Sequence, residues 1–242
     1  MNIKLNAMHC VAQAIAIAVR SACLAVTLWL LAAGAAIAET ACVDVRIQTH
    51  GAGSDDLALV RTGIERAAAF FEMHELALRP GITLHLRPDG IANKANHIGL
   101  YDAADARIDL ITFSRSSEHA AAFHSPMSRS VYASFVTHEL AHALAEQYFS
   151  DSGGTLVAHE YFAYVAQLAS LPAADRRQIL ARYPIEGFTD IDEISPMYYL
   201  LDPCAFGVKA YLHYRDLPDK RGFIAELLAG DTGLSGDLPE WW

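Results

Sequence analysis

The sequence predicts an α+β fold for a single domain that spans residues 39–242. Segments in which apolar and polar residues alternate lie in the N-terminal half, at 43–49 and 82–87, and residues 108–113 form a further, apolar strand segment. The C-terminal half is dominated by segments with the apolar spacing of helices. Apolar residues make up 53% of the 242-residue chain, which is enough for one sizeable core. We therefore expect a small sheet with an N-terminal helix, followed by a mainly helical part.

Residues 1–38 have the pattern of an export signal. Lys4 and Arg20 are their only charged residues, residues 24–33 form a compact apolar run, and residues 36–38 read AIA. These are the basic, hydrophobic and A-x-A parts of a secretory signal, with a long leading region. An uncleaved membrane anchor is the alternative, but the apolar run is short for a membrane span. We expect cleavage after Ala38 and a periplasmic or secreted protein without stable membrane association.

The remaining chain is acidic and contains two cysteines. Loss of the signal removes two basic residues and no acidic residue, so the net charge changes from −10 to −12. Nucleic acid and anionic membrane surfaces are poor partners for such a chain. Cys42 and Cys204 remain, and two cysteines in an exported protein predict one disulfide. The oligomeric state has no signature in the sequence.

The N-terminal half is expected to alternate strands with one long helix. After the strand at 43–49, the apolar spacing at about 55–78 predicts a helix, which Pro80-Gly81 ends. We expect His74 on the surface of this helix. Strands are predicted at 82–87 and 108–113, with a loop over 88–106.

The next helix carries the densest group of reactive residues. Ser125-Pro126 is its expected cap and first position, and residues 135–144 read FVTHELAHAL. Residues four apart share a helix face, so His138 and His142 can bind one metal ion together. Glu139 lies beside them and can act as a general base on a metal-bound water. The alternative is a core helix with two hydrogen-bonded histidines, since the helix is apolar nearly all round.

Two loop histidines precede this helix. His119 and His124 either line a cleft or, as is commoner for loop histidines, face the solvent.

A catalytic zinc usually has three protein ligands, so a third is expected. A helix over about 155–170 would present Glu160, Ala163, Tyr164 and Gln167 on one side. We predict Glu160 as the third ligand. His159 is the rival, because the rotation of the helix decides between the two. An ordinary polar pair on a second helix is the remaining interpretation.

These residues resemble a known group of enzymes. HELAH followed by a glutamate on the next helix is similar to the gluzincin metallopeptidases, which include thermolysin and the aminopeptidase N type. Residues 159–163 (HEYFA) further resemble the N-E-G-F-A stretch that carries the third ligand in the aminopeptidase N type. The likeness covers about 131–168. It implies a zincin-like fold in which the strand at 108–113 borders the cleft.

The resemblance also implies one zinc ion per chain, with Glu139 as the catalyst and His138, His142 and Glu160 as ligands. The sequence departs from the families at two points. Tyr164 stands where they often place an acid that orients a histidine, which bears on how firmly zinc is held. No G-x-M-E-N motif, typical of exopeptidases, precedes HELAH.

The rest of the chain is expected to be helical at 172–183, 203–214 and 223–228, with a turn-rich segment at 184–193. In the resembling enzymes a tyrosine or histidine of the C-terminal part helps to stabilise the oxyanion. The available candidates are Tyr198, Tyr199, Tyr211 and His213.

The residues together predict a secreted zinc metallopeptidase that hydrolyses a peptide or protein substrate. The alternative is an exported zinc-binding module that uses the same frame without turnover. An intact Glu139 favours the enzyme, whereas Tyr164 favours the module.

Overall fold

A computed structural model describes residues 43–49, 51–92, 94, 97–119, 121–149 and 154–234. The predicted export signal lies outside these ranges. So does Cys42, and with it the predicted disulfide to Cys204.

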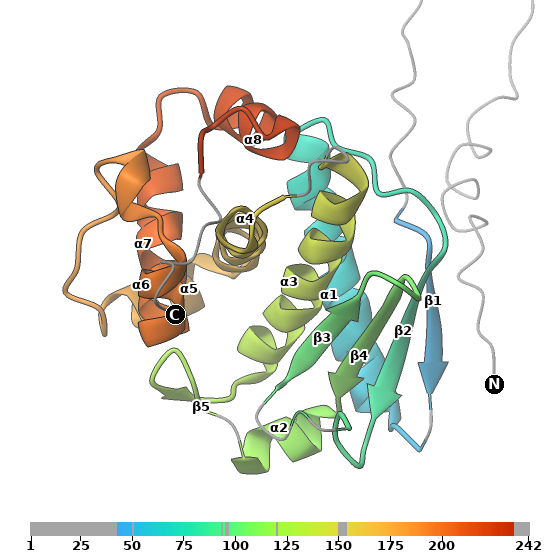
Figure 1. Cartoon of the computed structure of the whole chain (residues 1–242). Coiled ribbons are helices and arrows are strands. Elements are labelled where there is room, and N and C mark those ends of the chain that lie inside the picture. The colour runs from blue at the N-terminus through green and yellow to red at the C-terminus, as the bar shows by residue number, and fades with distance from the viewer. Residues whose placement is uncertain are drawn as a thin grey trace, which may run out of the picture.

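The fold is α+β, as predicted, and combines a small mixed sheet with a mostly helical C-terminal part (Figure 1). The N-terminal elements are β1 (Val45–Thr49), α1 (Ser54–Met73), β2 (Ile82–Arg87), β3 (Gly99–Asp102), β4 (Arg107–Ile111), α2 (Phe113–His119), β5 (Ala121–Ala122) and β6 (Ser125–Pro126). The described residues then form α3 (Arg129–Tyr148), α4 (Leu156–Ala169), α5 (Ala173–Leu180), a short 3-10 helix η2 (Ile191–Glu193), α6 (Pro196–Leu201), α7 (Pro203–Asp216) and α8 (Lys220–Ala229).

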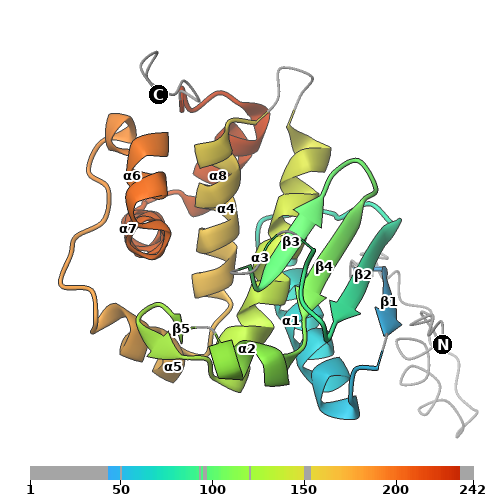
Figure 2. The same cartoon turned by 60° about the horizontal axis from the view of Figure 1, so that its bottom comes forward.

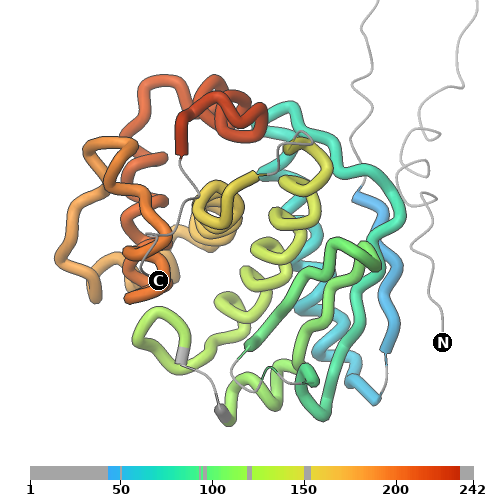
Figure 3. The backbone as a smooth tube through the Cα atoms, viewed as in Figure 1, coloured from blue at the N-terminus to red at the C-terminus, as the bar shows by residue number. Residues whose placement is uncertain are grey.

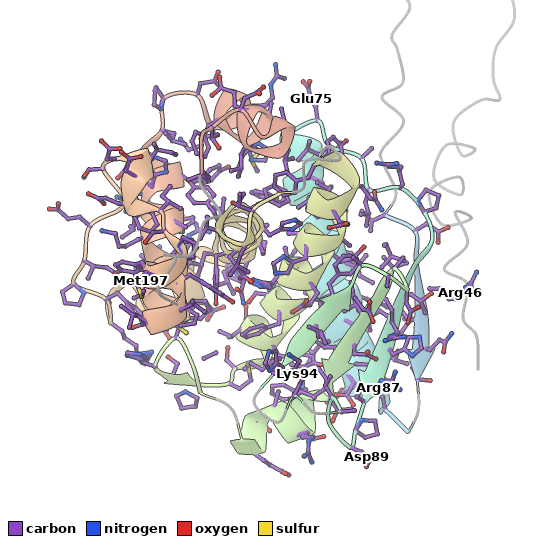
Figure 4. All side chains as sticks on the ribbon, in the orientation of Figure 1. Arg46, Glu75, Arg87, Asp89, Lys94 and Met197 are labelled. Carbon is purple, nitrogen blue, oxygen red and sulfur yellow. The ribbon has the colours of Figure 1, made fainter. Side chains whose placement is uncertain are left out.

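The four-stranded sheet has the order β1-β2-β4-β3. Strands β1, β2 and β4 are parallel, and β3 runs antiparallel to β4 at the edge. Residues of alternate positions, such as Leu84 and Ile108, are buried toward the helices. Figure 4 shows Arg46 of β1 on the opposite side of the molecule from Met197 of α6. The sheet therefore forms one side of the molecule, and the late helices form the other.

The helix α3 lies between these two parts. Across the molecule, the sheet is followed by α1 and α3 and then by α4 and α7, as Figures 2 and 3 show. Residues on every side of α3 are buried, including Val131, Val136, Leu140 and Leu144. This confirms the prediction of a helix that is apolar nearly all round. A helix in this place can receive partners from both parts of the molecule.

A glycine allows α1 to approach α3 closely. A Cβ atom on Gly63 would lie 2.4 Å from the carbonyl oxygen of Ala133 and 2.5 Å from Cβ of Val136. The Thr137 hydroxyl donates a hydrogen bond of 3.1 Å to the Gly63 carbonyl. Thr137 precedes the HELAH segment, so this contact fixes the rotation of α3 at its reactive residues.

The first helix is shorter than predicted. It ends at Met73 instead of about residue 78, and the chain turns away through Glu75, whose φ is 57°. Leu76 and Leu78 lie in an irregular segment and are still buried. Their apolar spacing therefore predicted a longer helix than the structure has. The expectation that His74 lies on the surface is wrong. His74 is buried because its ring packs on Phe70 and bonds to the hydroxyl of Tyr214 at 2.9 Å.

Two other boundaries differ from the predictions. The predicted loop over 88–106 contains β3, which is short and becomes a strand by pairing with β4. The cap of α3 is Ser128, whose hydroxyl accepts a hydrogen bond from the Val131 N–H at 3.2 Å. Ser125-Pro126, the predicted cap, instead forms the short strand β6. Within the described ranges no helix has the length and apolarity to cross a membrane.

Candidate metal centre

Two imidazoles of α3 face each other at the centre of the molecule. His138 and His142 lie one turn apart, and their Nε2 atoms are 3.1 Å apart. His138 is 8% exposed, and His142 is half-buried. The spacing of the two histidines thus directs both nitrogens toward one point, as an i, i+4 pair on a helix does.

Helix α4 brings a carboxylate to the same point. Thr155 caps this helix by accepting a hydrogen bond from the Ala158 N–H at 3.2 Å, and Glu160 follows in its second turn. The carboxylate oxygens of Glu160 lie 3.7 Å from Nε2 of His138 and 3.8 Å from Nε2 of His142. The potential ligand atoms of these three residues all lie within 4.8 Å of one another.

These distances suit a zinc ion. Zinc binds nitrogen and oxygen ligands at about 2.1 Å, so two ligands of a tetrahedral site lie about 3.4 Å apart. The observed separations of 3.1, 3.7 and 3.8 Å bracket that value. The donor set of two imidazoles and one carboxylate is one that catalytic zinc sites use.

His159, the rival ligand, has its ring centroid 6.1 Å from that of His142, but it is not part of the group whose ligand atoms lie within 4.8 Å of one another. Its Nε2 atom lies 3.9 Å from a carboxylate oxygen of Glu146, and its ring packs on Phe149 with 4.5 Å between centroids. The rotation of α4 therefore brings Glu160, and not His159, to the two histidines of α3.

Burial sets the protonation of the three groups. It lowers the pKa of His138 to about 4 and the pKa of His142 well below its ordinary value, so both imidazoles are neutral near pH 7. Burial raises the pKa of Glu160 to about 7, against a hydrogen bond from Tyr199 that lowers it. Neutral imidazoles are the form that binds metal. A bound cation would also favour the ionised form of the glutamate.

Glu139 lies beside this group and against the edge strand. Burial, followed by the nearby Glu160, raises the pKa of Glu139 to about 8, whereas a hydrogen bond from the Tyr101 N–H lowers it. A Cβ atom on Gly99 would lie 2.5 Å from Oε1 of Glu139, so glycine is needed at this position of β3. The strand that sequence reasoning missed thus positions the candidate base from the opposite wall.

A cavity of about 570 Å³ opens over the group. Its walls come from β3, α3 and α4, together with Tyr199 of α6 and Pro203 of α7. The expectation that the strand at 108–113 borders the cleft is wrong, because β3 pairs with β4 at the edge of the sheet and is the strand that lines the cavity. A substrate in this cavity would meet the three candidate ligands, Glu139 and the edge strand together.

Of the four candidates for oxyanion stabilisation, Tyr199 is the one that lines this cavity. Its hydroxyl donates to Glu160. Tyr198 packs on Phe188, and His213 bonds to Tyr161. Tyr211 is buried and packs under Arg176.

Of the two upstream histidines, His124 is not among the described residues that line the cavity. His124 is exposed and stacks near Tyr183. The side chain of His119 lies outside the described part of the structure.

A chain of polar side chains supports His138 from behind. Its Nδ1 atom lies 3.1 Å from Oε1 of Gln167, and Nε2 of Gln167 lies 3.2 Å from the hydroxyl of Ser134. Tyr164, at the position where an acid was anticipated, packs its ring on His138 with 4.8 Å between centroids. Sequence reasoning placed Gln167 on the same side of its helix as Glu160, but gave it no role.

The fold and the site define an α+β protein with a buried His-His-Glu group that could hold a metal ion in a cavity between its sheet and its late helices. By sequence the chain belongs to DUF6639, a family of unknown function, whose model matches residues 47–236. The match includes every residue of the site. No curated protein and no solved structure matches the chain.

Proposed function

We propose that this protein is a zinc-dependent peptidase that acts in the periplasm or outside the cell. The observation that carries the proposal is the convergence of His138, His142 and Glu160 in one buried group, with Glu139 beside it and a cavity above it. Export is proposed from the pattern of residues 1–38.

The chemistry follows from the residue types. A bound zinc ion would polarise the scissile carbonyl and a water molecule. Glu139 would take a proton from that water and pass it to the leaving amine. Burial favours the protonated form of Glu139 in the metal-free protein, and a cation bound beside it would favour the ionised form, which is the form that accepts a proton. Among the four C-terminal candidates, Tyr199 is the one that lines the cavity, and its hydroxyl, which donates to Glu160 in this structure, would turn to the oxyanion to stabilise it.

A peptide substrate fits the edge strand. Strand β3 pairs with β4 on one side, and its other side borders the cavity. An extended peptide can pair with such a free edge through its main chain. Nucleic acid remains a poor candidate for this acidic protein.

The alternative is a zinc-binding module without turnover. One observation favours it: Tyr164 packs on His138 at the position where the resembling enzymes often carry an acid. Metal analysis combined with a cleavage assay separates the two functions.

The test combines metal analysis with a peptide-library cleavage assay of the purified protein. We expect one zinc per chain and hydrolysis that the Glu139→Gln variant loses by orders of magnitude while it keeps its zinc. Zinc binding without cleavage of any peptide would support the module. Cleavage that persists in Glu139→Gln would exclude Glu139 as the base.

Export has a separate test. Mass spectrometry of protein recovered from the periplasm or medium should give a chain that starts at Glu39. An intact Met1 in the cell interior would contradict it.

A further inference from the structure

We propose that Gln167 is a positioning residue which, together with Ser134, holds His138 in the one tautomer that can bind a metal through Nε2. The inference rests on the proposed metal site, but not on peptidase activity. It assigns the support of His138 to a neutral amide.

Gln167 contacts the Nδ1 side of the His138 ring. An amide oxygen can only accept a hydrogen bond. Because Oε1 of Gln167 lies 3.1 Å from Nδ1 of His138, this nitrogen must carry the proton. The lone pair then lies on Nε2, which faces His142 and Glu160. The reverse orientation of the amide would place an N–H against Nδ1 and a proton on Nε2, where it would block the metal.

Ser134 keeps the amide of Gln167 from reversing. The hydroxyl of Ser134 has one proton, and it donates this proton to the carbonyl oxygen of Val131 at 2.6 Å. Its oxygen can therefore only accept from Gln167, at 3.2 Å. The NH₂ group of Gln167 is thus fixed toward Ser134, and its oxygen toward His138. The direction of every hydrogen bond in the chain follows from one backbone carbonyl.

Both residues that support His138 are shielded from solvent. Ser134 and Gln167 are both fully buried, at 0% exposure, so bulk water cannot replace either of them as a hydrogen-bond partner. An unsatisfied buried group is costly, which strengthens the preference for the one arrangement that satisfies all members. Gln167 lies two helical turns after Glu160 on the same face of α4, so one helix supplies both a metal ligand and the support of another ligand.

The experiment measures zinc affinity and the His138 tautomer in the purified protein. Gln167→Met keeps the side-chain length but removes the acceptor, and we expect zinc to bind about 10- to 100-fold more weakly. Ser134→Ala frees the amide to reverse and should weaken zinc binding by a smaller factor. In the double variant, the Ser134 change should add nothing further, because both residues act through one chain of hydrogen bonds.

Ser116→Ala is the matched control. Ser116 is also fully buried, and its hydroxyl donates to the carbonyl three residues earlier, as that of Ser134 does, but it lies in α2 and outside the cavity lining. This variant should lose a similar amount of stability to Ser134→Ala and keep the zinc affinity of the unmutated protein. Competition with a chelator of known affinity gives the dissociation constants, and thermal unfolding of the metal-free proteins gives their stabilities.

Nitrogen NMR of histidine-labelled, metal-free protein reads the tautomer without metal or activity. His138 should carry its proton on Nδ1 in the unmutated protein and lose this preference in Gln167→Met. A proton on Nε2 in the unmutated protein would overturn the inference. So would a zinc affinity of Gln167→Met equal to that of Ser116→Ala, or an unmutated protein that binds no zinc. A protein that binds zinc with these effects but cleaves no peptide would leave the inference standing and remove the proposed peptidase activity.

Discussion

Replacement of Gly63 by alanine should destabilise the protein by about 2 to 3 kcal/mol, although alanine is the better helix former. In an exposed helix the change would stabilise by about 1 kcal/mol. Here the added methyl would lie 2.4 Å from the Ala133 carbonyl oxygen and 2.5 Å from Cβ of Val136. These atoms belong to or adjoin the backbone of α3, so relief requires the two helices to separate. Overpacking of this kind costs about 3 kcal/mol at its upper end, and loss of the Thr137 hydrogen bond adds about 1 kcal/mol.

Urea unfolding followed by circular dichroism gives the free energy of unfolding of this variant. Thr62→Ala is the control, because Thr62 directly precedes Gly63 on α1 and its hydroxyl bonds within its own helix. The control should stay within about 0.5 kcal/mol of the unmutated protein. If Gly63→Ala is as stable as the control, α1 and α3 do not approach each other this closely, and the contact with Gly63 does not fix the rotation of α3 at HELAH.

Three further substitutions test other parts of the account. Gly99→Ala would place a methyl group 2.5 Å from Oε1 of Glu139 and displace this carboxylate. Because small displacements of a catalytic group are costly, peptide hydrolysis should fall about 100-fold while the zinc content stays unchanged. Full activity would argue against Glu139 as the base. Burial lowers the pKa of His74 in the folded protein. Below about pH 6.5 the unfolded chain therefore binds a proton at this residue that the folded chain does not bind. The free energy of unfolding should fall as the pH falls, by at most about 1.4 kcal/mol per pH unit. Urea unfolding between pH 5 and 7 should show a shallower slope in His74→Phe, and an equal slope would contradict the assignment. Tyr199→Phe removes the hydroxyl that bonds to Glu160 and should lower kcat about 100-fold with zinc retained; an unchanged kcat would exclude Tyr199 from oxyanion stabilisation.

The sequence was informative where local pattern alone decides the structure. The apolar spacing around HELAH predicted a buried helix, and the structure has one from Arg129 to Tyr148. The same reasoning predicted the helix that carries Glu160 and Gln167, and the structure has it as Leu156–Ala169. In both helices the spacing of side chains also fixes which residues share a face.

The sequence was uninformative where distant segments decide the structure. Gly99–Asp102 lacks an alternating pattern and becomes a strand only through pairing with β4. His74 is buried because Tyr214, 140 positions later, covers it. The support of His138 by Gln167 depends on the relative rotation of two helices, which no local pattern contains.

The central claim is that Glu160 of α4 is the third ligand of the zinc ion. The zinc content of two variants at adjacent positions of α4 tests it. Glu160→Ala and His159→Ala differ by one position in the same helix, so any general effect on α4 is shared. After dialysis against a zinc buffer, elemental analysis should find one zinc per chain in the unmutated protein and in His159→Ala, and a large loss in Glu160→Ala. Full zinc in Glu160→Ala together with loss in His159→Ala would contradict the assignment of the metal centre.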